Sequence, residues 1–196
     1  MDAFVAEQYN NELPKPDKKK NPDITITSSM PSDPVKISTT ERKTSKVLPL
    51  ILYWQFDYRH TCVLNPAIAV SNFRKIIYQQ ANKLTQKLGG KQIELNVEQA
   101  PGAFAIVDKA HILLLFIHWD RLYVEPDFKD LVVSYKVSQN GNETKSGKIT
   151  INNIEKNRDI RFAQSWKSSA SEFLGEYNVD VADMSKNFVT KLLEEL

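Results

Sequence analysis

The sequence predicts an α+β fold: a mixed, largely antiparallel sheet packed by one central helix and two C-terminal helices. Three observations support this prediction. Runs of β-prone residues are spread from residue 47 to residue 151, either alternating in hydropathy or continuously apolar. One amphipathic stretch interrupts them at residues 71–88, and the last 40 or so residues follow the helical period. Because strands and helices do not alternate regularly, a largely antiparallel sheet is favoured.

The strand predictions rest on apolar runs and on one turn signal. Residues 47–56 and 111–119 are apolar almost throughout, which is typical of strands buried on both faces, and we expect residues 47–56 to form a central strand. Residues 93–97 alternate apolar and polar side chains, as a half-buried strand does. Asn140-Gly141 lies between two further β-prone runs and predicts a hairpin.

The central helix has recognisable ends. Ser71 is a suitable N-cap, and Gly89-Gly90 ends the helix because glycine readily adopts the positive φ found after a helix C-terminus. The apolar residues lie three and four apart on one face. They are Phe73, Ile76, Ile77, Ala81, Leu84 and Leu88.

The C-terminal segment predicts two helices. We expect the first to end at Gly175 and the second to be capped by Asp180. Trp166 from the first and Phe188 from the second are expected to complete the core that the central helix begins.

Residues 1–46 are predicted to be a flexible, proline-containing N-terminal tail in front of a single α+β domain of residues 47–196. Five of the nine prolines lie here, Lys18 to Lys20 form a short basic run, and little in the stretch can build a core. Residues 23–27 and 35–39 alternate in hydropathy and could add strands to a sheet edge. We expect residues 1 to about 20 to be detached from the core.

Charge and composition exclude several classes of function. The 26 basic and 24 acidic side chains leave a net charge of +2, too balanced for the strong field that drives non-specific nucleic-acid binding. The single cysteine, Cys62, excludes an internal disulfide and a multi-cysteine zinc site within one chain. The longest apolar runs are far below the roughly 20 residues that a transmembrane helix needs. The common nucleotide, hydrolase and metalloprotease motifs do not occur, and we expect no cofactor and no metal site.

Two short constellations are candidates for chemistry. His60 and Cys62 lie two apart on an extended segment, so the imidazole could deprotonate the thiol or share a metal ion with it. His118 and Asp120 have the same spacing, and an aspartate can orient a histidine tautomer. Neither pair has an evident third partner. We therefore predict no catalytic residue, and we expect Cys62 to be a structural core residue with an unactivated thiol.

An aromatic-rich strand end is the candidate surface for a ligand or a partner. Trp54, Phe56 and Tyr58 share one face of an extended segment. Exposed rings suit a protein partner or a planar ligand, and they also stack on nucleic-acid bases. The alternative is that these rings pack beneath the helices as ordinary core. The predicted binding residues are Trp54, Phe56, Tyr58, Arg59, His118 and Asp120.

Four features define the plan of the chain: polar, proline-containing residues 13–34, the apolar strand at 47–54, the helix at 71–88 and the closing helix at 180–196. This plan resembles that of the small lipoproteins of the Gram-negative cell envelope, in which a flexible segment tethers a compact α+β domain. The chain departs from them because no lipobox and no N-terminal cysteine precedes the tail. The resemblance implies a periplasmic location, a lipid anchor if a leader was removed, and a binding or assembly role, with no catalytic residue carried over.

Three hypotheses follow. The leading one is a non-catalytic binding or assembly module, tethered in the cell envelope and acting on a protein partner or small ligand through its sheet edge or its aromatic patch. The second is a small enzyme that uses His60 with Cys62, or His118 with Asp120. The third is a cytoplasmic nucleic-acid-associated protein, which the absence of a signal peptide favours if Met1 is the natural start. The oligomeric state is left open.

Overall fold

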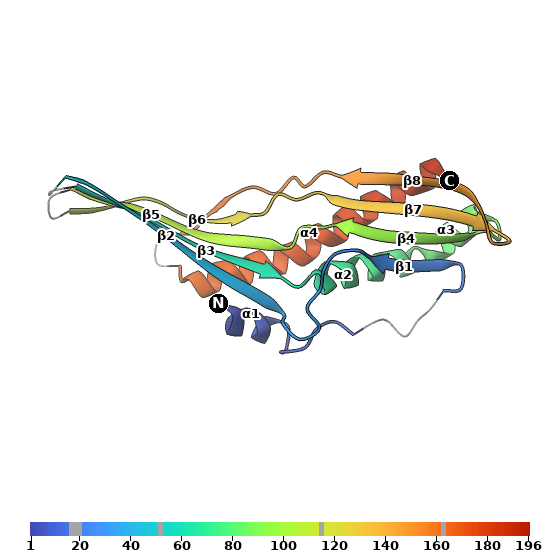
Figure 1. The fold of residues 1–196 in the computed structure, drawn as a ribbon, viewed down its shortest axis with the longest axis horizontal. Coiled ribbons are helices and arrows are strands. Elements are labelled where there is room, and N and C mark those ends of the chain that lie inside the picture. Colours follow the sequence, from blue (N-terminus) through green and yellow to red (C-terminus); the bar gives the residue numbers. More distant parts are fainter. Residues whose placement is uncertain (16–20, 51–52, 114–115, 162–163) are drawn as a thin grey trace.

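The computed structural model describes the backbone of residues 1–15, 21–50, 53–113, 116–161 and 164–196, and the side chains of these ranges except at 46–50, 53–54, 112–113 and 116–121. The fold is α+β, as predicted, with two sheets and four helices among the described residues. The molecule is elongated, and its strands and its C-terminal helix run roughly along the long axis (Figure 1).

The first sheet is mixed and has the strand order β1-β4-β7-β8. β1 (Ile24–Ser28) pairs in parallel with β4 (Gln92–Gln99) at the sheet edge, which confirms the predicted edge strand within residues 23–27. Ile93, Leu95 and Val97 are buried while their neighbours on β4 are more exposed, so the predicted half-buried alternation is also confirmed.

The predicted Asn-Gly hairpin joins the other two strands of this sheet. β7 (Leu131–Gln139) and β8 (Asn142–Ile151) are antiparallel, and Gln139 pairs with Asn142 across the turn. Asn140 and Gly141 both have positive φ, as a type I′ turn requires. The loop is therefore two residues long.

The second sheet is antiparallel and has the order β2-β3-β5-β6-β9. Its strands are β2 (Ser38–Leu50), β3 (Tyr53–Leu64), β5 (Ala103–Leu113), β6 (Phe116–Pro126) and β9 (Arg158–Asp159). The first four form two long hairpins that pair with each other through β3 and β5. Their far ends, described at residues 45–50, 53–57, 109–113 and 116–121, extend past the helices as a twisted ribbon, which we call the arm (Figure 1).

The two long apolar runs are the ends of these hairpins rather than continuous strands. The prediction of one central strand at residues 47–56 is wrong, because Leu50 pairs with Tyr53 and the run divides between β2 and β3. Leu113 pairs with Phe116 in the same way, so residues 111–119 divide between β5 and β6. Neither division is marked by glycine or asparagine, the residues that usually signal a tight turn.

The central helix starts earlier than predicted and is interrupted. α2 (Pro66–Gln79) follows Asn65, whose side-chain oxygen accepts a hydrogen bond from the Ala67 N–H, so Asn65 rather than Ser71 is the N-cap. α3 (Ala81–Leu88) begins after Gln80, and Gly89 ends it at a φ of 59°, as predicted. The predicted stripe is buried at Phe73, Ile76, Ile77, Leu84 and Leu88.

The C-terminal segment forms one helix, not the two that we predicted. α4 (Trp166–Glu195) is 30 residues long and continues through Gly175 and Asp180. The reason is a buried face that runs the length of the helix and packs against α2, where the Phe73 and Phe188 rings meet edge to face at 5.3 Å. Phe188 is fully buried, as predicted, but Trp166 is 40% exposed and does not complete the core.

The N-terminal segment is partly built into the fold. α1 (Asp2–Gln8) buries Val5 completely, and the Asp2 carboxylate accepts hydrogen bonds from Ser38 and Thr40 of β2. The prediction that residues 1 to about 20 are detached is therefore wrong for α1, whose seven residues are too few to show a clear helical period. The Lys18 to Lys20 run lies outside the described residues. The domain boundary at residue 46 stays a prediction, although β2 runs across it.

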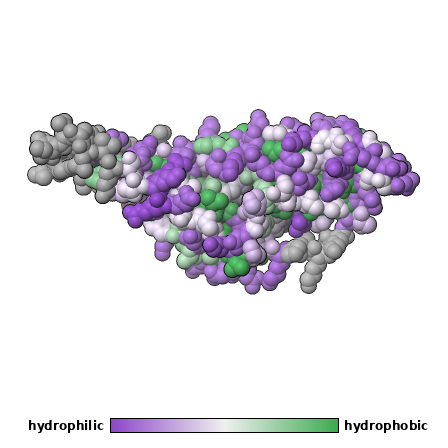
Figure 2. Space-filling model, viewed as in Figure 1, coloured by the Kyte–Doolittle hydropathy of each residue, from purple (hydrophilic) through white to green (hydrophobic). Residues whose placement is uncertain are grey.

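One main hydrophobic core joins the two sheets. It contains residues of α1, α2, α3 and α4 as well as strands of both sheets. α4 contacts β6 of the second sheet and β7 and β8 of the first, so it spans both (Figure 1). Hydrophilic residues dominate the visible surface of this body, apart from scattered apolar ones (Figure 2). Among the described residues, no helix combines the length and the apolar character needed to cross a membrane.

Candidate functional site

The predicted aromatic surface lies on β3, where the strand enters the arm. Phe56 and Tyr58 share one face, with their rings stacked at 6.0 Å between centroids and 7° between planes. Both side chains are half-buried. Trp54 lies on the same strand and pairs with Ile112, but its side chain is outside the described part of the structure. The shared face of Phe56 and Tyr58 is as expected, and a role in binding stays a prediction.

His118 and Asp120 lie on β6, at a point where the regular alternation of side chains between the two faces of the strand is interrupted. His118 is the register partner of His111 on β5. Trp119 pairs with Ala110 and Arg121 with Lys109, so Asp120 is an extra residue in a β-bulge. A bulge disturbs the two-residue periodicity that would place His118 and Asp120 on one face. The side chains of both residues lie outside the described part of the structure.

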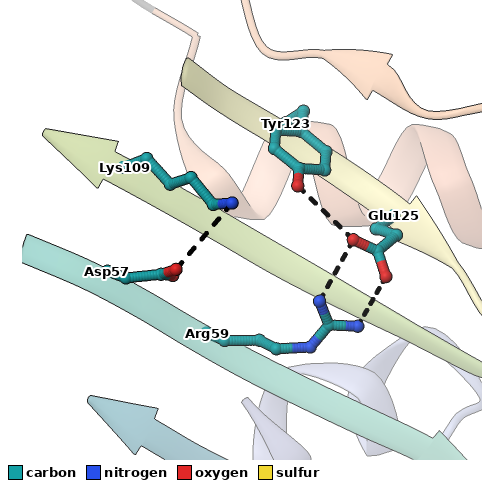
Figure 3. A network of polar contacts seen from close by, with 5 residues as sticks. All are labelled: Asp57, Arg59, Lys109, Tyr123 and Glu125. Atoms are coloured by element: carbon teal, nitrogen blue, oxygen red, sulfur yellow. Dashed lines mark hydrogen bonds and ion pairs between the residues drawn. The ribbon is translucent and has the colours of Figure 1, made fainter. Parts of the chain in front are cut away.

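Arg59 belongs to a polar network with Asp57, Lys109, Tyr123 and Glu125 (Figure 3). Because successive side chains of a strand alternate between the two faces, this network lies on the opposite face of the sheet from Tyr58. The Arg59 guanidinium donates two hydrogen bonds to the Glu125 carboxylate, at 3.1 and 2.6 Å, and the Tyr123 hydroxyl donates a third at 3.4 Å. Lys109 and Asp57 form a further ion pair at 3.8 Å. The hydrogen bond with Glu125 raises the pKa of Arg59, and the same bond lowers the pKa of Glu125.

This network ties the two hairpins together. Arg59 is on β3 and Glu125 is on β6, and β5 lies between them. A bidentate arginine–carboxylate pair fixes both side chains in one geometry. Arg59 is therefore engaged in an ion pair within the fold, and its predicted role in binding stays a prediction.

His60 and Cys62 lie on one face of β3, as predicted, but in different surroundings. Cys62 is fully buried in the main core, and this burial raises the pKa of its thiol. Burial lowers the pKa of His60, and the positive charges of Arg42 and the amino terminus lower it further. A buried neutral thiol is a poor nucleophile. Among the described residues, no group of three or more histidine, cysteine or acidic side chains could hold a metal ion.

A pocket that the sequence did not indicate lies where the arm joins the body. We call it the base pocket; its volume is about 540 Å³. Its lining residues are Met1, Arg42, Tyr58, His60, Ile106, Asp108, Leu122 and Trp166. The strand register explains this grouping. Arg42, His60 and Ile106 are direct partners across β2, β3 and β5, and Tyr58, Asp108 and Leu122 are direct partners across β3, β5 and β6.

Asp108 is the unusual residue of the base pocket. One of its carboxylate oxygens, Oδ1, is shielded from solvent and has no hydrogen-bond partner within the described part of the chain. Burial raises the pKa of Asp108. A buried acceptor without a donor destabilises the fold, and such groups in native proteins often mark a site of function. The sequence signal is weak but present: on β5, Asp108 follows Phe104 and Ile106 at two-residue spacing and interrupts their apolar face.

A second pocket, of about 470 Å³, lies between the segment after β8 and α4. Burial raises the pKa of Glu155 to about 7, and the neighbouring Asp180 carboxylate adds to the effect. Arg158 lies between acidic groups: it forms ion pairs with Glu155 at 3.8 Å, with Asp180 at 3.6 Å and with Glu176. These residues are up to 25 positions apart in sequence and share no motif, so sequence reasoning had no means of grouping them.

Comparison of the chain with protein-family models, with curated protein sequences and with solved structures gives no match.

Proposed function

We propose that the protein is a non-catalytic binding or assembly module of the cell envelope, and that it acts by inserting the end of its arm into one leaflet of a membrane. The observation that carries the proposal is a concentration of apolar residues at the end of a ribbon that extends beyond the helices (Figure 1). Where a fold leaves a large apolar patch uncovered, the patch usually marks a protein or membrane interaction site.

The arm end is defined as residues 48–54 and 112–117. These stretches read Leu-Pro-Leu-Ile-Leu-Tyr-Trp and Ile-Leu-Leu-Leu-Phe-Ile, so every residue is apolar or aromatic. Backbone pairing brings them together, because Tyr53 pairs with Leu113 on the neighbouring hairpin. The next row toward the body is polar, where Gln55 pairs with His111 and His111 with His118. The change from apolar to polar is therefore abrupt.

The apolar residues are consecutive, which favours lipid over a protein groove. Consecutive residues of a strand lie on opposite faces of a ribbon, so both faces of the arm end carry apolar positions. A groove in a partner protein covers one face, whereas acyl chains surround both. If the protein does not bind membranes, we expect the arm end to bind a partner protein instead.

The length of the arm end supports shallow insertion. The two described rows beyond the Gln55–His111 row, Trp54–Ile112 and Tyr53–Leu113, reach about 7 Å at the usual rise of a strand. This is within the roughly 15 Å of hydrocarbon in one leaflet. Within the described part of the arm, the outer edges of β2 and β6 have no strand partner, and this opposes deeper insertion because hydrocarbon offers no partner to unpaired backbone groups. Trp54 and Trp119 lie close to the polar row, and tryptophan prefers the membrane interface.

The test is binding to vesicles of phosphatidylethanolamine and phosphatidylglycerol, measured by flotation. We expect the wild-type protein to float with the vesicles, and Leu50→Ser combined with Phe116→Ser to reduce the bound fraction at least tenfold. The matched control is Ile154→Ser combined with Val179→Ser, because these residues are 87% and 58% exposed on the body. The control should bind as the wild type does.

Tryptophan fluorescence gives a second readout. Trp166→Phe leaves Trp54 and Trp119, both in the arm, as the only tryptophans of the chain. We expect their emission to shift to the blue with vesicles and to be quenched by lipids brominated near the headgroup. Absence of vesicle binding, or equal binding by the arm variant and the control, would contradict the proposal.

A further inference from the structure

The base pocket has the dimensions and the lining of a small-ligand site. Its volume of about 540 Å³ falls within the roughly 300–1,000 Å³ of such sites. Ile106, Leu122 and Trp166 supply apolar wall, while Tyr58, His60 and Asp108 supply polar groups. In such sites, a small number of polar groups that converge on an otherwise apolar pocket fix the orientation of the bound ligand.

We propose that the base pocket binds a protonated amine carried on an apolar body, with the Asp108 carboxylate as its ion-pair partner. Asp108 lines the pocket, and its carboxylate has no ion-pair partner among the described residues, so a ligand ammonium can pair with the carboxylate from the pocket side, while the shielded Oδ1 adds to the need for a neutralising partner. An ammonium donor also brings the opposite charge, and charge-assisted hydrogen bonds are about twice as strong as neutral ones.

The other lining residues fit the same ligand. Burial lowers the pKa of His60, so near neutral pH its imidazole is uncharged and does not compete for Asp108. Trp166 is 40% exposed beside the pocket, and because the Lys167 ammonium already lies over its ring at 5.9 Å, the indole serves the ligand as apolar wall. Arg42, which is exposed on β2, and the amino terminus at Met1 add positive charge at the pocket, which repels a second positive charge on the ligand and attracts an anionic remainder. The preferred ligand therefore has one ammonium group and an uncharged or anionic remainder.

This inference does not depend on membrane insertion. The base pocket and the arm end lie at opposite ends of the arm, and they share no residue. The ammonium group could come from a free small amine or from a lysine side chain of a partner protein, whose four-carbon stem is itself apolar. Both sources present the same chemistry to Asp108.

Isothermal titration calorimetry on the full chain tests the proposal with a matched set of probes. These are 2-phenylethylamine, the neutral 2-phenylethanol and the anionic 3-phenylpropionate, with Nα-acetyl-lysine methylamide to represent a partner lysine. We expect the amine to bind at least tenfold more tightly than the alcohol, a difference of about 1.4 kcal/mol. Tighter binding by the lysine derivative than by 2-phenylethylamine would identify a protein side chain as the source.

Asp108→Asn provides the decisive variant, because the side chain keeps its size and loses its charge. We expect it to lose at least tenfold in affinity for the amine and to keep its affinity for the alcohol. The matched control, Asp57→Asn, removes an aspartate on the opposite face of the same sheet and should bind as the wild type does.

A thermal melt separates loss of binding from loss of folding. We expect Asp108→Asn to melt at or above the wild-type temperature, because it removes a poorly solvated charge without a partner. The proposal is overturned if neither amine binds at millimolar concentration, if 3-phenylpropionate binds more tightly than 2-phenylethylamine, or if Asp108→Asn binds the amine as the wild type does.

Discussion

The body and the arm are built from the same antiparallel pairing but are stabilised differently. In the body, both sheets contribute to one core, and side chains such as Leu95, Val133 and Phe188 are completely buried. At the start of the arm, Phe56 and Tyr58 are only half-buried, and the Lys109–Asp57 ion pair is about 40% exposed on each side. The stability of the arm therefore depends mainly on backbone pairing and cross-strand contacts, whereas the stability of the body depends mainly on buried apolar area.

The largest effect should come from the centre of the body. Phe188→Ala removes a fully buried ring that packs on Phe73, and such a truncation costs about 3–5 kcal/mol. Phe56→Ala in the arm should cost clearly less, because that ring is half-buried. Urea denaturation measures both free energies of unfolding. Equal losses would show that the arm is as tightly packed as the body.

A smaller loss is expected at the edge of the same core. Leu84→Ala on α3 should cost about 2–5 kcal/mol, because Leu84 is fully buried. Lys83→Ala is the control, since Lys83 is exposed on the adjacent position. If the two variants unfold at the same urea concentration, the assignment of the buried face of α3 is wrong.

The third prediction concerns the pH dependence of the body. The pKa of Glu155 is raised to about 7 in the folded protein, against an ordinary value of 4.5, by burial and by Asp180. Between these values the folded state holds a proton that the unfolded chain releases, so stability falls as pH rises through this window. Glu155→Gln stays neutral and should lose less stability than the wild type between pH 5 and pH 8. Parallel stability curves for the two proteins would refute this account.

The smallest effect is expected where the arm joins the body. Arg59→Met removes the pairing with Glu125 but keeps much of the side-chain volume, and partly exposed ion pairs contribute about 0.2–1 kcal/mol. Hydrogen exchange should show faster opening of β3 and β6 next to Arg59 and Glu125, at the base of the arm, and unchanged exchange in β4 and β7. Faster exchange throughout the molecule would mean that the arm and the body open as one unit.

The sequence predicted correctly those elements whose conformation is determined by residues close together in the chain. The Asn140-Gly141 hairpin, the C-terminal end of α3 at Gly89 and the alternation of β4 each follow from residues within a few positions. The division of residues 47–56 between two strands has no such signal, since a continuous apolar run is equally typical of a buried strand. Gly175 shows the converse error, because the buried face of α4 outweighs the helix-ending tendency of a single glycine.

The candidate sites were harder to predict because they depend on strand register. Arg59 and Tyr58 are neighbours in sequence, yet they serve opposite faces of the sheet, one in an ion pair and the other in the base pocket. The pocket exists only because β2, β3, β5 and β6 align particular rows, and one residue of shift would place a different set of side chains there. Asp108 was therefore missed, whereas Phe56 and Tyr58, two residues apart on one strand, were correctly grouped.

The uninterrupted course of α4 has a mechanical consequence. At about 1.5 Å per residue, its 30 residues extend about 45 Å. The helix is packed against strands of both sheets, so the sheets cannot rotate against each other without bending it. The second sheet continues directly into the arm, so packing against α4 should also resist bending between the described part of the body and the arm. We therefore expect a force applied at the arm to move the body as one unit, including the far end of the molecule, where the C-terminus lies (Figure 1).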